Sequence, residues 1–583
     1  MQWILSMVFT FFLKVISLFS LKHTASLLYL LSIQKIFPKK IHKVKIMSSK
    51  LLQPQYWQFL LVAAIAIQGW LPGIGQVAIG NSTPAPSAIL ELKSSSQGFL
   101  PPRMTTQQRN AIPSPAQGLI IFNTEEQSLN FYNGDFWEST RTGVDFDPCA
   151  NGLPFMLGGS ATVLPTGIAV DASGNYIIAG GFTGTLSLGS NTINNQGGFD
   201  LFITKISAGG EVLWYSAAGL TGFETIRSIK TLNNGDLIIC GTQSGTLNFL
   251  NTTFTDVNGG IEFFVARIST DGEVRWKKSF DLQGSGEILS MAVGDRDQIY
   301  IGGRFSGSIN PGGTNLLTNS KLELFLASLD SAGTWKFIRT SALATAANNT
   351  LDRIAVQGNK VYLIGSYGGN MTLGNISLST TSSSVWIARA DSLGNFMWAF
   401  DAENQNQSFS GPLAVHPEGD LLVGLAYQGV NFTFGGLSVP NASGRDFLLA
   451  RVDSTGTIKW VNKYGGAGNE TLSDLEFDEK GKLFGIGQNS GALTLGSFTL
   501  TSGGLWLSEI AASNGNIQWL TGMPSNGSSG FLHDLKTTTR EQLIILGRIA
   551  GSFQFGDEAC NSRTATSNST AVIIKADKSG RIF

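Results

Sequence analysis

Hydrophobic and polar positions alternate in short runs along most of the chain. Within residues 167–216, four such runs cover residues 167–171, 175–182, 200–206 and 211–216, separated by clusters of Gly, Asn and Asp. Short runs of aliphatic, aromatic and β-branched residues bounded by turn formers predict β-strands. The pattern therefore predicts an all-β chain with four strands in each unit and no helix of ordinary length inside the units.

The four-strand unit recurs along the chain. A Gly followed four positions later by Trp closes five units, at Gly210–Trp214, Gly272–Trp276, Gly394–Trp398, Gly456–Trp460 and Gly515–Trp519, and Gly333–Phe337 closes a sixth. A second landmark recurs at Gly184, Gly245, Gly307, Gly369, Gly429, Gly491 and Gly551. Two independent markers with one period of about 61 residues predict an internal repeat.

One four-stranded sheet cannot bury both of its faces, whereas copies packed around an axis can. The seven copies of the second landmark predict a seven-bladed β-propeller of four-stranded blades over residues 154–583. Each closing Trp then packs in the seam between two blades; a stripe for sugar stacking is the alternative. The recurring Asp-x-x-Gly tetrads predict hairpin turns, with calcium binding as the alternative.

The two ends of the repeat region predict how the ring closes. The seventh copy begins at Gly580 and ends at Phe583, before its Trp position. Residues 153–159 correspond to the part of a unit that follows the Trp. We therefore expect residues 155–157 to complete or cover the outer strand of the last blade, so that both ends of the ring lie in one blade.

The N-terminal residues have the composition of targeting sequence. Met47 is followed by one Lys and the apolar run 59–67, which predicts a signal peptide over residues 47–75, cleaved before Gln76. Residues 1–46 are then an upstream artefact of a misplaced start. The alternative is an N-terminal membrane segment at residues 3–20, where Lys14 would cost a few kcal/mol at the centre of a bilayer.

Residues 76–140 do not follow the repeat and predict a small β-rich module, followed by a linker at residues 141–153. Residues 88–92 and 119–122 predict short strands, and Asn133-Gly134 predicts a two-residue hairpin. The residue pattern of this stretch resembles the N-terminal segment of secreted or surface proteins of Gram-negative bacteria, some with phage tail-fibre-like ends. The resemblance implies export, surface display and self-association.

The repeats themselves resemble those of the bacterial secreted seven-bladed β-propeller repeat family (SBBP-like). The motifs that carry the resemblance are Gly-x-Leu-x-Leu-Gly at residues 491–496, the acidic, aromatic and basic positions of residues 444–451, and Asp-x-x-Gly-x-x-x-Trp at residues 453–460. Residues 382–386 and 567–572 lack the acidic position. The resemblance implies an extracellular scaffold or binding protein and no reaction.

Composition and cysteine content narrow the possibilities further. Charged residues make up 14% of the chain and the formal net charge is −1, so no overall field attracts nucleic acid or anionic lipid. Cys240 and Cys560 align with apolar positions of other copies, which predicts buried hydrophobic side chains. Cys149 lies in the predicted linker, and a Cys149–Cys560 disulfide is an alternative for an exported chain.

The sequence predicts no catalytic, cofactor-binding or metal-binding residue and no cofactor. His416 and His533 occupy non-equivalent positions, in a turn and before a first strand, and form no metal set or nucleophile–base pair. The third strands carry recurring pairs, predicted to be solvated or inter-blade ion pairs: Asp200/Lys205, Glu262/Arg267 and Asp446/Arg451. Glu224, Glu287 and Glu470 precede first strands and form a candidate cation or sugar site at one mouth of the channel.

The sequence thus favours a secreted or cell-surface β-propeller that acts as an adhesin-like binding or scaffold protein, without enzymatic activity. The expected partner is a protein or glycan at a ring mouth, with no nucleic acid, no membrane span in the mature chain, and self-association through the N-terminal module. The alternative is a carbohydrate-active lyase or glycosidase with channel carboxylates, which requires two or more carboxylates of raised pKa to converge there. A structural component of a fibre is a third hypothesis.

Overall fold

The computed structural model describes residues 77–80, 82–83, 85–124, 128–132, 137–139, 155–256, 259–311, 316–318, 321–341, 349–402, 407–429, 432–439, 442–466, 468–525, 527–538, 542–555, 562–564 and 569–582. The chain separates into two compact units, Met1–Arg141 and Thr142–Phe583. Among the residues described, no helix has the length and apolar character needed to cross a membrane. The predicted division of the chain into residues 1–46, 47–75, 76–140, 141–153 and 154–583 stays a prediction.

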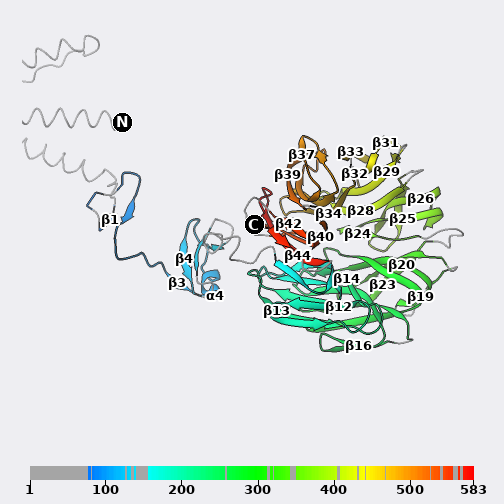
Figure 1. Ribbon diagram of the computed structural model, residues 1–583, viewed down its shortest axis with the longest axis horizontal. Helices are drawn as coiled ribbons and strands as arrows, with labels where there is room; N and C mark the ends of the chain where they lie inside the picture. The colour runs from blue at the N-terminus through cyan, green and yellow to red at the C-terminus, as the bar shows by residue number, and fades with distance from the viewer. Residues whose placement is uncertain are drawn as a thin grey trace, which may run out of the picture. The chain divides into compact units, whose positions relative to one another are not determined.

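The N-terminal unit contains short strands and one helical turn (Figure 1). A parallel pair and a four-stranded sheet are formed by β1 (Val77–Ile79) with β2 (Leu90–Leu92), and by β3 (Arg103–Met104), β4 (Ile120–Asn123), β5 (Ser128–Tyr132) and β6 (Trp137–Ser139). Helix α4 (Thr106–Asn110) was not predicted from the sequence; it begins with a capping box between Thr105 and Gln108. The predicted strands are confirmed within two residues, and Asn133-Gly134 lies outside the described residues.

The repeat region is all-β and its first unit has the four strands expected from the sequence. They are β8 (Thr162–Val170), β9 (Tyr176–Thr183), β12 (Asp200–Ile206) and β13 (Val212–Ala218), in the antiparallel order β8-β9-β12-β13. The Asp-x-x-Gly turn between β8 and β9 forms as predicted, because Asp171 Oδ1 accepts the backbone N–H of Ser173 at 2.9 Å and Gly174 has a φ of 81°. We call this set of strands unit 1.

Six further four-stranded units follow the same order in the described residues. Unit 2 has β14 (Thr225–Thr231), β15 (Leu237–Ser244), β18 (Ile261–Ile268) and the start of β19 (Val274–Val293); unit 3 has the rest of β19, β20 (Ile299–Ile309), β22 (Glu323–Leu329) and β23 (Trp335–Thr340). Unit 4 has β24 (Arg353–Gln357), β25 (Lys360–Leu373), β26 (Ile376–Asp391) and β27 (Phe396–Asp401); unit 5 has β28 (Gln407–Val415), β29 (Leu421–Gly429), β32 (Ala442–Val452) and β33 (Ile458–Gly466). Unit 6 has β34 (Glu470–Phe477), β35 (Leu483–Asn489), β38 (Gly504–Ile510) and β39 (Ile517–Pro524); unit 7 has β40 (Ser529–Thr537), β41 (Gln542–Ala550), β44 (Thr570–Asp577) and β7 (Phe155–Gly159).

Most units carry a small extra hairpin or strand between their second and third strands. These are β10 (Thr185–Leu188) with β11 (Asn191–Asn194), β16 (Leu247–Phe249) with β17 (Thr252–Phe254), β21 (Leu316–Leu317), β30 (Phe432–Phe434) with β31 (Leu437–Val439), β36 (Leu493–Leu495) with β37 (Phe498–Leu500), and β42 (Ser552–Gln554) with β43 (Ser562–Thr564). The Gly-x-Leu-x-Leu-Gly motif supplies these hairpins, because its two Leu side chains point to one face and are buried, as Leu493 and Leu495 are.

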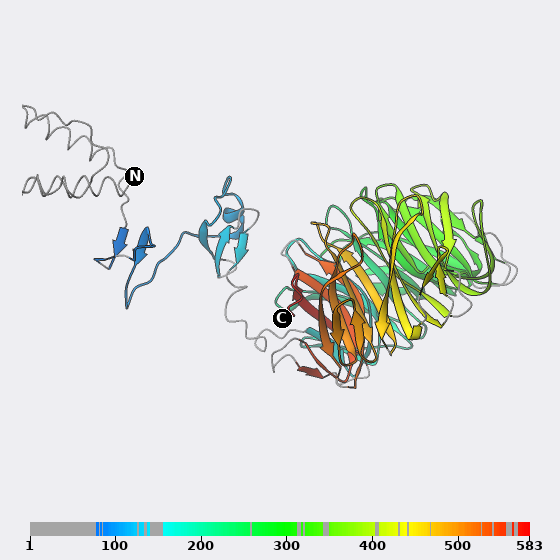
Figure 2. The ribbon, with the colours of Figure 1, turned by 90° about the horizontal axis from the view of Figure 1, so that it is seen from above.

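The last unit takes its fourth strand from the beginning of the repeat region. Strand β7 pairs antiparallel with β44, with Leu157 opposite Ala571 and Phe155 opposite Ile573. This confirms the prediction that residues 155–157 complete the outer strand of the last unit. The first strands also contact one another in chain order, and β40 of unit 7 contacts β8 of unit 1. In both ribbon views the red C-terminal strands lie beside the cyan strands that begin the repeat region (Figure 1, Figure 2). No hydrogen-bonded sheet in the described residues closes on itself.

The Trp side chains pack between units, as predicted. Trp276 Nε1 donates to the carbonyl of Ser331 in the next unit at 2.8 Å, and Trp398 Nε1 donates to that of Ser454 at 3.1 Å. Each ring also lies against the Gly of the following Asp-x-x-Gly turn, where a β-carbon at Gly456 would approach Trp398 to 3.1 Å. The Trp series therefore has a packing role, which accounts for its regular recurrence.

Candidate binding cavity

A cavity of about 120 Å³ lies among the first strands, and all seven units contribute to its lining. Its acidic lining residues are Asp474, Glu476 and Asp534. Its basic lining residues are Arg227, Lys230, Arg353 and Lys536, and His533 also lies in its wall. The charged groups concentrate on units 2, 4, 6 and 7, because the equivalent positions of the other units are occupied by residues such as Gly167, Ser290 and Leu413.

A β-bulge in the first strand of most units directs these side chains inward. In unit 6 the register shifts between Leu472 and Asp474, and in unit 7 between Leu532 and Asp534. The residue after each bulge faces the cavity. Since alternate residues of a strand share one face, Glu476 and Lys536, two positions further along, face the cavity as well.

The residues after the bulges connect neighbouring first strands through hydrogen bonds. Asp474 Oδ2 accepts the backbone N–H of Leu535 at 2.9 Å, and Asp534 Oδ2 accepts that of Ile168 at 3.0 Å. The second of these bonds links unit 7 to unit 1. Each aspartate therefore has a structural role at the cavity wall as well as a charge that faces the cavity.

The carboxyl groups of the cavity have very different proton affinities. Burial acts to raise the pKa of Asp534, but Lys536, whose Nζ lies 2.7 Å from Asp534 Oδ1, and Lys230 lower it to about 2. Burial raises the pKa of Glu476 to about 7, since Lys536 Nζ is 3.9 Å away and offsets only part of the desolvation. Burial and the charge of Asp534 raise the pKa of Asp474. Near neutral pH the cavity therefore holds both ionised and protonated carboxyl groups.

The lysine and histidine of the cavity shift in opposite directions. Burial would lower the pKa of Lys536, but the charges of Asp534, Glu476 and Asp474 outweigh it, so the pKa is raised. Burial lowers the pKa of His533 to about 3, and Arg548 and Arg353 contribute to that shift. His533 is therefore neutral at physiological pH and is no source of positive charge. His533 lies within β40, the first strand of unit 7, so the prediction that it precedes a first strand was wrong by a few residues.

The structure separates the three glutamates that the sequence grouped at a channel mouth, and none of them lines the cavity. Glu224 and Glu470 are equivalent and buried, and they accept the backbone N–H groups of Leu220 at 2.9 Å and Gly466 at 3.0 Å. Burial, opposed in part by the Gly466 N–H, raises the pKa of Glu470 to about 7.

Glu287 does not belong to that set, because it lies one strand position further along. Ile226 and Ile288 face equivalent glycines of the second strands, and Glu224 precedes Ile226 by two positions whereas Glu287 precedes Ile288 by one. A shift of one residue places a side chain on the opposite face of a strand. Glu287 accordingly forms an ion pair with Arg227 at 2.9 Å. The predicted set of three equivalent glutamates was therefore wrong.

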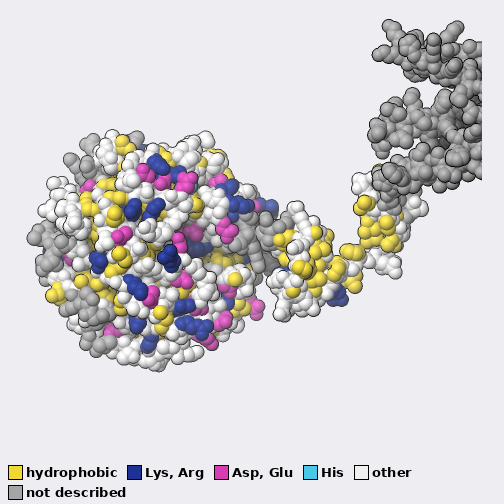
Figure 3. Space-filling model, turned by 180° about the vertical axis from the view of Figure 1, so that it is seen from behind, with side chains coloured by type: hydrophobic (Ala, Val, Ile, Leu, Met, Phe, Trp, Pro, Cys, Tyr) yellow, Lys and Arg dark blue, Asp and Glu magenta, His cyan; other side chains and the backbone are white. Residues whose placement is uncertain are grey.

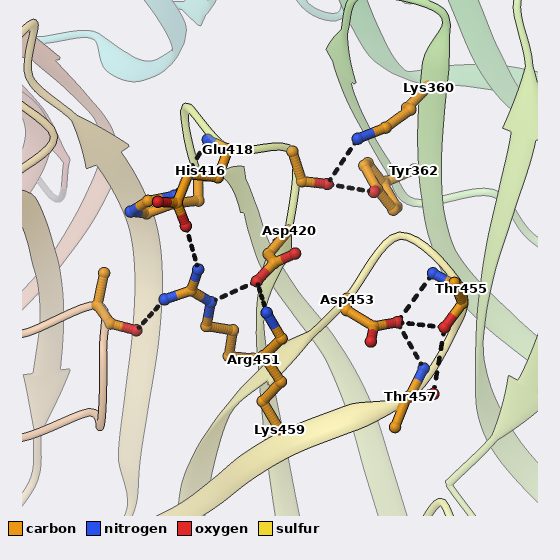
Figure 4. A network of polar contacts seen from close by, with 12 residues as sticks. Lys360, Tyr362, His416, Glu418, Asp420, Arg451, Asp453, Thr455, Thr457 and Lys459 are labelled. Carbon is orange, nitrogen blue, oxygen red and sulfur yellow. Dashed lines mark hydrogen bonds and ion pairs between the residues drawn. The ribbon is translucent and has the colours of Figure 1, made fainter.

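The third-strand ion pairs also differ from the prediction. Arg451 Nε pairs with Asp420 Oδ2 at 2.7 Å and its Nη1 donates to the carbonyl of Ala512 in the next unit at 3.2 Å (Figure 4). Arg267 bonds in the same way to Asp236 and to the next unit, and Lys205 pairs with Asp171. The acidic partner thus lies in the turn between the first and second strands of the same unit, and Arg267 and Arg451 also reach the next unit.

The other candidate residues of the sequence, His416 and Cys240, lie in structural positions. His416 accepts the backbone N–H of Glu418 at its Nδ1 in a turn, and burial lowers its pKa (Figure 4). Cys240 is fully buried as predicted, and burial raises its pKa to about 12, so its thiol is unreactive. Cys149 and Cys560 lie outside the described residues. In the described part of the chain, no group of three or more His, Cys, Asp or Glu residues is arranged to hold a metal ion.

The family comparison matches the N-terminal region of the chain. Residues 78–153 match a family described as a phage tail like trimerisation region. No curated protein is significantly similar to the chain in sequence.

Solved structures with some similarity include a polysaccharide lyase of family PL25, an ulvan lyase, at 10% identity and a TM-score of 0.41, covering 72% of this chain and 95% of that chain. The polysaccharide lyase Uly1 has 9% identity and a TM-score of 0.37 over 70% of this chain and 89% of that chain. A protein of unknown function from Bacteroides caccae has 12% identity and a TM-score of 0.29 over 55% of this chain and 88% of that chain. Similarities this low support no inference about activity.

Proposed function

We propose that the repeat region, residues 154–583, is a seven-bladed β-propeller whose blades are units 1 to 7. The contacts between successive first strands, including that between β40 and β8, support this arrangement. The shared fourth strand β7 supports it as well, because it joins the beginning of the region to its last unit. The same proposal includes the likeness of the repeats to the SBBP-like family and a binding surface at one mouth of the ring.

We further propose that the chain is exported and acts as a trimeric, cell-surface binding scaffold of the adhesin type. The single observation that carries this proposal is the match of residues 78–153 to a phage tail like trimerisation region. A trimer would present three copies of the repeat region, and several weak contacts made together bind far more tightly than one. Export directed by a signal peptide at residues 47–75 is part of the proposal.

The surface of the N-terminal unit supports self-association. Nine of the eighteen exposed large apolar side chains in the described residues belong to this smaller unit, among them Ile89 at 76% exposure and Leu100 at 73% (Figure 3). A small unit with so much apolar surface is more stable when a second copy covers it. The face of the repeat region seen in Figure 3 carries charged side chains of both signs.

Light scattering coupled to size-exclusion chromatography tests the proposal. The exported chain is expected at three times its chain mass. Leu100→Asp and Ile89→Asp should shift it toward a monomer, since a charge in an apolar interface opposes association. Leu317→Asp, at a side chain 64% exposed in unit 3, is the matched control and should remain a trimer. A wild-type chain that elutes only as a monomer would refute trimerisation.

The carbohydrate-active enzyme remains a second candidate, because Asp474 and Glu476 both have raised pKa values and both line the cavity. Two residues apart on one strand face, their carboxyl groups are separated by roughly 7 Å, a spacing used by glycosidases. The cavity volume of about 120 Å³ argues against this candidate, since small-molecule sites usually have at least about 300 Å³. New reducing ends from a panel of neutral and acidic polysaccharides, lost in Glu476→Gln, would establish the enzyme and displace the scaffold.

A further inference from the structure

We propose that the cavity binds one small oxyanion, of the size of phosphate, sulfate or a carboxylate group, between Lys230, Arg353 and Lys536. These residues come from the first strands of units 2, 4 and 7, so the site exists only when those strands surround one space. The proposal depends on the cavity alone. It is therefore independent of trimerisation and of any ligand at a ring mouth.

The cavity has a suitable size and lining. A volume of about 120 Å³ holds several water molecules or one tetrahedral anion, and is too small for a sugar ring with its neighbours. Arg353 is an exposed residue in its wall, which gives a small ion a path from solvent. The cavity therefore selects for a compact ligand.

The basic residues of the wall are not all neutralised by the protein. Lys536 pairs with Asp534 at 2.7 Å, and Arg227 pairs with Glu287 at 2.9 Å. Within the described ranges, by contrast, neither Lys230 nor Arg353 has a carboxylate within the 4.0 Å of an ion pair. Lys230 and Arg353 act on the carboxyl groups of the cavity only through longer-range charge, as Lys230 does on Asp534 and Arg353 does on Asp474, so both can pair directly with an anion. Arg353 offers a planar fork suited to an oxyanion.

The hydrogen bonding of the wall is also incomplete. Nε of Arg227 and Nε2 of His533 are buried and have no hydrogen-bond partner in the part of the chain that the structure describes. An unpaired buried polar group is unfavourable, and an N–H donor of this kind is satisfied by an oxyanion.

The two acidic residues with raised pKa values make binding depend on pH. Asp474 and Glu476 face the same space as the other titratable and charged groups of the wall, which are Arg227, Lys230, Arg353, His533, Asp534 and Lys536. In their protonated form they donate hydrogen bonds to an anion, whereas in their ionised form they repel it. Since the pKa of Glu476 is raised to about 7, affinity should fall as the pH rises through that value.

Titration calorimetry of the full chain with inorganic phosphate, sulfate and acetate, at constant ionic strength, tests the site. We expect saturable binding with one site per chain, stronger at about pH 6 than at about pH 8. Lys230→Gln and Arg353→Gln should each weaken binding about ten-fold, and Lys230→Arg should retain it. Lys336→Gln, in a surface ion pair of β23, is the matched control and should bind like the wild type.

The outcomes separate the source of the anion and refute the site if it is absent. Glucuronate that competes with phosphate would assign the site to the acidic group of a larger ligand, whereas phosphate binding without competition would assign it to the free ion. No saturable heat with any of the anions, or equal binding by the wild type and by folded Lys230→Gln and Arg353→Gln, would overturn the proposal. Far-ultraviolet circular dichroism identifies which variants are folded.

Discussion

The ring of Phe155, at the start of the repeat region, lies against Gly210, the turn glycine of unit 1. A β-carbon placed at Gly210 would be 3.4 Å from Phe155 Cδ2. The other units place a Trp or Phe on the turn glycine of the next unit, as Trp276 does on Gly333 and Phe337 on Gly394. Phe155 therefore makes the same kind of contact between the last unit and the first, although its strand register places it two positions beyond the closing Trp position, opposite Ile573 as Ser216 is opposite Ile203.

Removing this contact should destabilise the repeat region. Phe155→Ala is expected to lower the free energy of unfolding by about 2 kcal/mol, less than for a fully buried Phe because Phe155 is half-buried. Tyr215→Ala, at a residue 40% exposed, should cost well under that amount. Urea unfolding followed by Trp fluorescence measures both. Equal effects of the two substitutions would show that Phe155 does not close the structure.

The indole hydrogen bonds between units should make a smaller, separable contribution. Trp398→Phe keeps the ring in the seam but removes the 3.1 Å bond from Nε1 to the Ser454 carbonyl. The loss should be about 1 kcal/mol, the usual net value of one hydrogen bond. Trp398→Ala should cost about 3 kcal/mol, because packing is lost as well. If the Phe variant is as unstable as the Ala variant, packing in the seam is not the main role of the ring.

The ion pair between Asp534 and Lys536 should matter more than a surface pair. Asp534→Ala removes the partner of Lys536 and the acceptor of the Ile168 N–H, which connects units 7 and 1. The expected loss is about 3 kcal/mol, since a largely buried cation loses its closer partner and keeps only Glu476 at 3.9 Å. Asp330→Ala, which breaks the surface pair with Lys336, should cost under about 1 kcal/mol. Thermal unfolding of both variants in one buffer checks the difference.

Glu476 should make stability fall as the pH rises. Its pKa is raised from 4.5 to about 7 in the folded chain, so between these values the folded state binds more protons than the unfolded state. By linkage, stability is highest below about pH 4.5 for this group and is lost as the pH rises through about 7. The side chain keeps 32% of its surface exposed, so solvent screens its charge.

The expected size of this effect is therefore only on the order of 1 kcal/mol. Glu476→Gln mimics the protonated form and should remove this part of the pH dependence, leaving the variant more stable than the wild type at about pH 8. Urea unfolding at several pH values compares the two chains. A variant with the same pH slope as the wild type would place the titration elsewhere.

Most of the strand order could be predicted from the sequence, because it follows from the local spacing of hydrophobic and turn-forming residues. Periodicity located the four strands of each unit, and the incomplete last copy predicted the pairing of residues 155–157 with unit 7. The grouping of Glu224 with Glu287 failed because the sequence does not show which residues of the first strands are equivalent: Glu224 lies two positions before Ile226, whereas Glu287 lies one position before Ile288. That difference of one position places the two side chains on opposite faces.

The cavity could not be found from the sequence for a related reason. Asp474 and Asp534 lie in strands that are far from Lys230 and Arg353 in the sequence and come together only when the first strands surround one space. The one local signal is a polar residue directly after the bulge, as at Ser228, Asp474 and Asp534. Whether that residue faces a shared cavity depends on how all seven units pack.

Hydrogen exchange of the backbone amides in β7 tests the closure of the repeat region most directly. If β7 is the fourth strand of unit 7, the amides of residues 155–157 that bond to β44 should exchange as slowly as those of β44, and Asp534→Ala should speed both together. Amides of residues 155–157 that exchange at the rate of an unstructured peptide while β44 stays protected would contradict a repeat region closed by its own first strand.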